Sequence, residues 1–318
     1  VTDSDGLQGS TSVLIFPQKV NLTFDTVPGG LEVTLDGIPH VTPFVYDTLV
    51  SFQHTIEAKN QVTPQNVCTF ASWSDGGAQQ HVITVPAAPL SYTATYTLTS
   101  NPVPSGLVAG YRFSEGAGIS VADISGNANT GTLTGAPTWT AGEYGGGLLF
   151  TGANYVDVGN GPSLQLTGSM TLSAWIKISA QPGDDGAIVA KLGPAGWQLK
   201  TSPDTGVRTA AIQISSNGSD AIQRYSNTVL AINTWYHLAG VYDATARTLS
   251  IYVNGVLDNG LIDGTVPAAQ FNSTFPVQIA QRPGNPGNFN FLGTIDEVHV
   301  FNRALGAAEI VTDMTIPR

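Results

Sequence analysis

The stretch that decides the fold runs Trp235-Tyr-His-Leu-Ala-Gly-Val-Tyr242, and a second apolar run, Leu249-Ser-Ile-Tyr-Val253, follows it closely. Both runs are short and rich in β-branched and aromatic residues, which is typical of strands. The dipeptide Asn254-Gly255 comes next, and Asn-Gly readily adopts the positive φ values of hairpin turns. This stretch predicts antiparallel strands joined by tight turns.

Similar runs continue on both sides of this stretch, from Leu107 almost to the end of the chain. They are Val108–Phe113, Leu148–Phe150, Tyr155–Val158, Met170–Ile178, Thr209–Ile214, Val277–Ile279 and Ile295–Phe301. About a dozen strands over roughly two hundred residues fit two large antiparallel sheets packed face to face. Only Ala307 to Asp313 has a helical pattern, with Gly306 as its cap.

The first hundred residues show the same kind of alternation, for example in Val20–Phe24, Leu31–Leu35 and Tyr92–Tyr96. Asp36-Gly37 has hairpin chemistry. About seven short strands without a helical period predict a separate β-sandwich over residues 12–98. Residues 1–11 are expected to be a flexible lead-in. Residues 99–106 contain two prolines and no charge, which predicts a short linker before a second domain at 107–318.

Composition supports two β domains and excludes several classes of function. The 318 residues include 36 glycines and only 11% charged residues, a bias that suits strands and turns better than helices. The net charge of -11 argues against a nucleic-acid partner, because phosphate binding needs clustered Lys and Arg. The sequence contains no apolar run of the length that spans a membrane. Cys68 is the single cysteine and lies in an apolar run, which predicts a buried, inert thiol.

Seven short motifs occur in order across residues 107–313. They are Leu107–Gly116, Val121–Gly131, Tyr144–Gly152, Met170–Trp175, Thr234–Asp243, Ile251–Gly255 and Gly293–Leu305. This part of the chain resembles the laminin-G-like, or concanavalin A-like, jelly roll of bacterial surface proteins and glycosidase accessory modules. The N-terminal part resembles a small Ig-like β-sandwich module of the kind appended to bacterial secreted enzymes, through Gly30–Gly37, Phe70–Ala78, His81–Ala87 and Tyr92–Tyr96. The predicted fold class is therefore all-β.

No catalytic pattern is found in the sequence, and we expect the protein not to be an enzyme. Jelly-roll enzymes of the laminarinase type carry their carboxylates in a Glu-x-Asp-x-x-Glu run, which is absent from this sequence. There is no Gly-x-Ser-x-Gly elbow, and the five histidines are scattered without metalloprotease spacing. His237 and His299 each lie inside a strand-like run, which indicates structural histidines.

A structural calcium ion is the cofactor that we predict. The turn from Asp123 through Asn127 to Asn129 is rich in oxygen ligands, and calcium takes six to eight of these. The resemblance implies that Asp296, near the C-terminus of the jelly roll, closes one ion site with Asp123, and that Asn127 or nearby carbonyl groups complete it. The alternative is that Asp123 and the asparagines make turn hydrogen bonds to their own backbone.

Glycan binding is the predicted function of the jelly roll. A sugar site needs an exposed aromatic ring for the apolar face of the sugar and polar groups for its hydroxyls. Trp139 and Trp197 are predicted to lie in Gly- and Pro-rich loops and are therefore expected to be exposed. The other candidates are Arg224, Tyr225, and Arg282 and Asn288 in the asparagine-rich segment 281–290.

We therefore expect a non-catalytic carbohydrate-binding or adhesion module, secreted or on the cell surface, within a larger bacterial protein. Its partner is expected to be a polysaccharide or surface glycan. The alternative is a structural spacer or a protein–protein interaction unit without glycan binding. An exposed aromatic platform with convergent polar groups on the concave sheet would favour sugar binding, whereas a concave face filled by loops or lined with small residues would favour the spacer. A close pair of buried carboxylates on that face would favour an enzyme.

Overall fold

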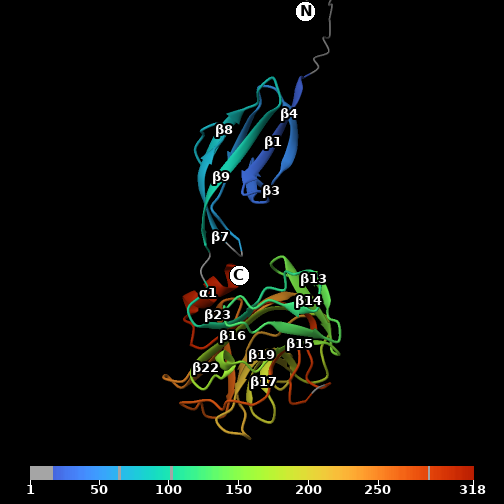
Figure 1. Cartoon of the computed structure of the whole chain (residues 1–318), viewed down its shortest axis with the longest axis vertical. Helices are drawn as coiled ribbons and strands as arrows, with labels where there is room; N and C mark the ends of the chain where they lie inside the picture. The colour runs from blue at the N-terminus through green and yellow to red at the C-terminus, as the bar shows by residue number, and fades with distance from the viewer. Residues whose placement is uncertain (1–16, 64–65, 101–102, 286) are drawn as a thin grey trace, which may run out of the picture. The chain divides into compact units, whose positions relative to one another are not determined.

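The chain divides into an N-terminal unit, Val1–Asn101, and a C-terminal unit, Pro102–Arg318 (Figure 1). The structure is a computed structural model that describes residues 17–63, 66–100, 103–285 and 287–318. The division falls inside the predicted linker at 99–106. The predicted lead-in at 1–11 lies outside the described residues.

The N-terminal unit is built from two sheets. The first sheet contains, in order, β4 (Phe44–Leu49), β1 (Lys19–Val27), β9 (Leu90–Ser100), β7 (Asn66–Trp73) and β6 (Gln61–Val62). The second contains β3 (Ile38–Val41), β2 (Glu32–Leu35), β5 (Gln53–Glu57) and β8 (Gln80–Thr84). One buried cluster joins side chains of both sheets, such as Phe24 of β1 and Ile56 of β5. The unit is therefore a β-sandwich, and its Ig-like nature stays a prediction.

Local sequence explains how these strands form. Along β1, buried side chains such as Leu22 and Phe24 alternate with more exposed ones, as the two-residue period of a half-buried strand requires. Asp36 and Gly37 have φ values of 52° and 82° and connect β2 to β3, so the predicted hairpin is confirmed. Cys68 is buried as expected, and burial raises the pKa of its thiol.

The C-terminal unit contains two larger sheets. The eight-stranded sheet contains, in order, β13 (Thr138–Ala141), β14 (Gly146–Thr151), β26 (Leu292–Phe301), β16 (Met170–Ile178), β21 (Trp235–Asp243), β22 (Thr248–Val253) and β23 (Val256–Leu257), with β10 (Leu107–Tyr111) paired to β26. The nine-stranded sheet contains β11 (Ser120–Val121), β12 (Gly131–Thr134), β15 (Tyr155–Gly159), β25 (Val277–Ile279), β17 (Gly186–Leu192), β18 (Gly196–Ser202), β19 (Thr209–Ile214), β20 (Ile222–Ser226) and β24 (Asn259–Asp263). A 3-10 turn, Pro162–Leu164, lies between β15 and β16.

The two sheets of the C-terminal unit pack face to face over one core. Leu172 and Ile176 of β16 belong to the same buried cluster as Leu199 of β18 and Ile212 of β19. A Cβ atom on Gly240 of β21 would collide with Ile212, which shows how closely the sheets approach. The predicted two-sheet jelly roll is confirmed.

The single α-helix of the described chain, α1 (Ala307–Thr315), packs beside β23 and closes over a buried polar cluster. Asp313 accepts a 2.6 Å hydrogen bond from Ser173 Oγ and lies 3.0 Å from Nδ1 of His299. Burial alone would lower the pKa of His299, but Asp313 and Glu297 outweigh it and raise this pKa to about 10. His237 lies 3.7 Å from Asp313, so both strand histidines are structural, as predicted. Among the described residues, no helix is long and apolar enough to cross a membrane.

Candidate functional site

A pocket of about 410 Å³ opens at one end of the jelly roll, where several strands begin or end. It is formed by residues 182–184 before β17, Gly152 after β14, and the loop that leads into β26. We call it the rim pocket and define it by its polar and aromatic lining residues: Asp184, Asn285, Asn288, Phe289 and Asn290. Its volume is in the range of pockets that hold small ligands.

The loop before β26 is fixed in place by contacts on both sides. Phe289 has a φ of 57°, and its carbonyl oxygen accepts a 2.9 Å hydrogen bond from the Ala187 N–H at the start of β17. The guanidinium group of Arg282 lies 4.3 Å from the centre of the Phe289 ring, at cation–π distance. The rim pocket therefore offers a held, half-buried aromatic ring.

Asn290 contributes an oxygen that lacks a hydrogen-bond partner. Its Nδ2 group donates to the carbonyl oxygen of Gly152, and because that partner is an acceptor, the orientation of the amide is settled. Within the described ranges, Oδ1 of Asn290 accepts no hydrogen bond, although the residue is only 8% exposed. An unpartnered buried acceptor costs free energy, and a donor from a ligand or water would relieve that cost.

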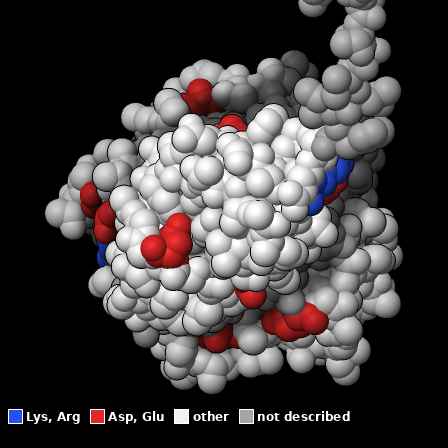
Figure 2. All heavy atoms as spheres, turned by 90° about the horizontal axis from the view of Figure 1, so that it is seen from above, with Lys and Arg blue, Asp and Glu red and all other residues white. Residues whose placement is uncertain are grey.

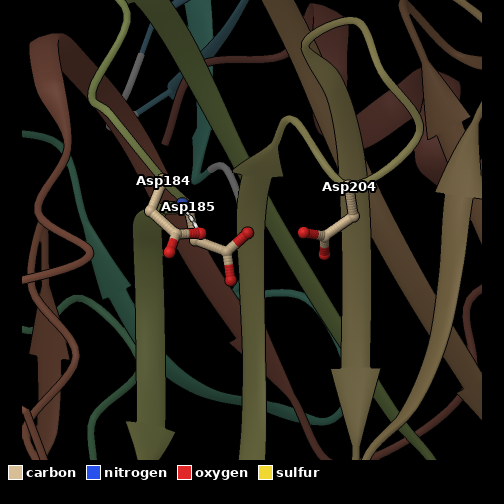
Figure 3. Close-up of side chains that lie close together, drawn as sticks. All are labelled: Asp184, Asp185 and Asp204. Atoms are coloured by element: carbon tan, nitrogen blue, oxygen red, sulfur yellow. Dashed lines mark hydrogen bonds between the residues drawn. The ribbon is translucent and has the colours of Figure 1, made fainter.

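Three carboxylates meet behind the rim pocket (Figure 3). Oxygen atoms of Asp184, Asp185 and Asp204 lie within 4.8 Å of one another, and Figure 3 shows Asp204 approaching from a neighbouring segment. Nζ of Lys200 lies 2.8 Å from Asp185 and 3.2 Å from Asp204. The ammonium group thus occupies the space between two of the carboxylates where a cation would bind.

The environment of Asp204 does not suit a general acid. Burial would raise the pKa of Asp204, but a 2.8 Å hydrogen bond from Tyr225 and the charge of Lys200 hold that pKa below its usual value. A glycosidase acid needs the opposite shift. Arg208 holds the loop beside the pocket, because its guanidinium group donates to the carbonyl oxygens of Pro182 and Asp184.

Two of the six predicted sugar-binding residues lie at the rim pocket. Asn288 lines it, and Arg282 stacks on its aromatic ring. Tyr225 lies nearby but is only 3% exposed and donates to Asp204. Arg224 donates to the carbonyl oxygens of Leu249 and Gly260, so its guanidinium group already has partners.

The two tryptophan predictions did not identify an exposed platform. Trp197 is fully buried in β18, so the prediction that it is exposed was wrong. Residues 193–195 form only a short connection between β17 and β18. Trp197 is the second residue of β18, and its side chain belongs to the buried core cluster. Trp139 is half-buried in β13, and its Nε1 group lies 3.4 Å from the carbonyl oxygen of Gly118.

The predicted calcium ligands have protein partners of their own. Asp123 accepts hydrogen bonds from the N–H groups of Gly110, Ser125 and Asn129 and from the Ser125 hydroxyl. Asn127 donates to the same hydroxyl oxygen, so Asp123 and Asn127 do share one turn. These bonds match the alternative interpretation of this turn.

Asp296 lies in β26 and is bonded to a different loop. It accepts hydrogen bonds from the N–H groups of Tyr144 and Glu297 at 2.9 and 2.7 Å. Burial raises the pKa of Asp296 to about 7, so its surroundings disfavour the charged form that a calcium ion needs. The groups around Asp123 and Asp296 are hydrogen-bond donors, which suit carboxyl oxygens better than they suit a bound cation. The calcium ion therefore stays a prediction.

Sequence reasoning missed Asp184, Phe289 and Asn290, although it singled out the loop that carries two of them. The asparagine content of residues 281–290 was the usable signal. Asp184 belongs to a segment about a hundred residues earlier, and only the pairing of the sheet brings it to the same pocket.

Two antiparallel sheets packed over one core define the C-terminal unit as a jelly-roll sandwich. A family model described as the concanavalin A-like lectin/glucanases superfamily matches residues 150–311, which is half of the chain. The chain belongs to this superfamily. A search of curated proteins gives no match.

Several solved structures are similar to this chain. The binding domain of Paraclostridial Mosquitocidal Protein 1 has a TM-score of 0.51 and 15% identity, covering 66% of this chain and 52% of that one. The binding domain of Botulinum Neurotoxin DC in complex with SialylT gives 0.50 and 13%, covering 68% and 53%. Domain 4 of AbnA, a GH43 extracellular arabinanase from Geobacillus stearothermophilus in complex with arabinotriose, gives 0.48 and 18%, covering 66% and 98%. The match to the first of these takes in about half of that protein's length, and at such identities the likeness shows the fold alone.

Proposed function

We propose that the chain is a non-catalytic carbohydrate-binding module and that the rim pocket is its sugar site. The observation that carries the proposal is the combination at this pocket of an aromatic ring with an unpartnered amide oxygen. Phe289 supplies a surface for the apolar face of a sugar ring. Asn288, Asn290 and Asp184 supply polar groups for its hydroxyls. Two of the similar structures are themselves described as binding domains, which agrees with a binding role.

The site is placed at the rim because the face of the nine-stranded sheet suits a ligand less well. Ala187 and Ala190 of β17 are small and fully buried, and they form a cluster apart from the main core. Gln198 alternates with core residues along β18 and is also fully buried. A face of this kind favours the alternative function, a structural spacer, whereas the rim pocket favours sugar binding.

The absence of catalysis is part of the proposal and rests on the carboxylates. Asp185 and Asp204 share one lysine, and the pKa of Asp204 is lowered, whereas a glycosidase acid needs a raised pKa. Secretion or cell-surface display by a bacterium, within a larger protein, belongs to the same proposal, as does a structural calcium ion at Asp123, Asn127 and Asp296. These parts are supported by composition and by the motif resemblance.

The test is binding of the full chain to a panel of soluble oligosaccharides, followed by titration calorimetry on any that bind. Phe289→Ala is expected to weaken binding at least tenfold, since stacking of a sugar on an aromatic ring supplies much of its apolar contact. Phe52→Ala is the matched control, because Phe52 is 53% exposed and belongs to the N-terminal unit. Equal affinities of the Phe289→Ala variant and the parent would move the sugar site away from the rim pocket. No binding to any member of the panel would favour the spacer.

A further inference from the structure

We infer that the rim pocket selects neutral sugar units and rejects sugars that carry a carboxylate or sulfate. This inference rests on the proposed function and names the class of sugar. It follows from the kinds of polar group that face the pocket and from where the neighbouring cations are held.

Several polar atoms at the rim pocket can accept hydrogen bonds from a ligand. Oδ1 of Asn290 has no donor within the described structure. Asn288 donates one Nδ2 hydrogen to Oδ1 of Asn285 at 3.1 Å, and its own oxygen can accept a hydrogen bond. Asp184 accepts a 2.8 Å hydrogen bond from the Asp185 N–H through one oxygen, and as a carboxylate it has further acceptor capacity.

A ligand that satisfies acceptors must bring donors. Sugar hydroxyl groups donate one hydrogen each, so a neutral sugar can pair with Asn290, Asn288 and Asp184 in turn. A carboxylate or sulfate group brings acceptor oxygens alone at neutral pH, and an acceptor facing an acceptor is repulsive. Asp184 adds a like charge at the same place, because it is the one ionisable side chain in the described lining of the pocket.

The nearby basic groups do not line the pocket, and Lys200 and Arg208 are already hydrogen-bonded to protein groups. Lys200 is 2% exposed and bound between Asp185 and Asp204. Arg208 is 4% exposed, and its guanidinium group donates to Thr201 and to two backbone carbonyl oxygens. Arg282 lies on the ring of Phe289. Burial lowers the pKa of its guanidinium group, although the charges of the three aspartates act in the opposite direction.

The charges of these groups cancel, since Asp184, Asp185 and Asp204 carry three negative charges and one lysine and two arginines carry three positive ones. The rest of the chain adds to the barrier against anions. The net charge is -11, and on the face drawn in Figure 2 acidic side chains are scattered while basic ones appear near its margins. An anionic sugar would approach a negative protein and then meet Asp184, with no basic side chain in the described lining of the pocket to compensate.

The experiment compares pairs of oligosaccharides that differ in one group, binding to the full chain at low ionic strength. Suitable pairs are galactose oligomers with galacturonate oligomers, and lactose with sialyl-lactose, within a wider panel of neutral and acidic sugars. We expect the neutral member of a pair to bind at least tenfold more tightly than the acidic member. We also expect this ratio to shrink at 0.5 M salt, because the ions screen the charge of Asp184.

Asp184→Asn tests the residue behind the selection. The amide can still accept the hydrogen bond from Asp185 N–H, but it carries no charge. We expect the neutral-to-acidic affinity ratio to fall at least fivefold in this variant. Asp47→Asn, in the N-terminal unit, removes the same charge elsewhere and is expected to leave the ratio unchanged. Circular dichroism and melting temperature confirm that both variants are folded.

The outcomes separate this inference from the proposed function. Acidic sugars that bind as tightly as neutral ones would overturn the neutral-sugar inference but would leave sugar binding standing. The same conclusion would follow if Asp184→Asn left the ratio unaltered. Absence of binding to every neutral and acidic sugar in the panel would overturn the proposed function and the inference together.

Discussion

Asp296 makes the stability of the C-terminal unit depend on pH in an unusual direction for an aspartate. Its side chain is fully buried, and its pKa is raised from 3.8 to about 7. The folded state therefore holds the proton more tightly than the unfolded state does. The stabilisation from protonation is fully present below about pH 3.8 and is lost as the pH rises through about 7.

The size of this effect follows from the shift. A change from 3.8 to about 7 corresponds to at most about 4 kcal/mol at 1.36 kcal/mol per pKa unit. Asp296→Asn removes the titration. The variant also loses a backbone hydrogen bond, because its amide nitrogen faces an N–H group of Tyr144 or Glu297, which costs about 1–3 kcal/mol at every pH. The difference in stability between the parent and Asp296→Asn is thus expected to change by a few kcal/mol between pH 4.5 and pH 8.

The assay is urea unfolding followed by tryptophan fluorescence at several pH values, first with a chelator present and then in a separate series with calcium and no chelator. The parent is expected to lose stability relative to Asp296→Asn as the pH rises. Parallel pH profiles for the two proteins would refute the reasoning. Calcium provides a second arm, since an ion bound at Asp296 would favour the carboxylate and reverse the sign of the slope. A reversed slope on adding calcium would support the predicted ion site.

Three further substitutions test the packing described above, each read from the midpoint of urea unfolding. Trp197→Ala should destabilise the C-terminal unit by about 3–5 kcal/mol, because it empties a fully buried site in the core, and a loss below about 1 kcal/mol would contradict that placement. Asp313→Asn should cost about 3–5 kcal/mol, because it removes this carboxylate from the buried His299. It should also lower the pKa of His299 measured by NMR. An unshifted histidine resonance would rule out the pairing of these two side chains. Gly142→Ala should cost about 1–3 kcal/mol, because a Cβ atom there meets Gly146 and Asp296, whereas Gly168→Ala, in open space, should be nearly neutral.

The parts of the fold that local chemistry dictates could be predicted from the sequence. The Asn254-Gly255 turn needs only two residues with positive φ, and both adopt it, at 49° and 77°. The strand Met170–Ile178 was predicted with the bounds that the structure has, because an apolar residue at every second position from Met170 to Ile178 follows the two-residue period of a strand.

The strands β17 and β18 were missed because tertiary contacts decide them. Lys191 and Lys200 break the apolar pattern of these segments, yet both are buried. Their ammonium groups are satisfied by distant partners, Asn272 for Lys191 and Asp185 for Lys200, and no local rule shows such pairings. Only part of the rim pocket could be predicted, for the same reason. The composition of its loop at residues 281–290 is recognisable, but the carboxylate of Asp184 comes from another part of the sheet.

The pairing of β10 with β26 has a consequence for how this unit can be used within longer chains. Leu107 pairs with Phe301, so the first and last strands of the jelly roll lie next to each other, as neighbouring strands do at about 5 Å. A domain whose two ends meet can be inserted into a surface loop of another protein without stretching that loop. The jelly roll is therefore suited to act as a cassette, either at the end of a polypeptide or within the loop of a host domain.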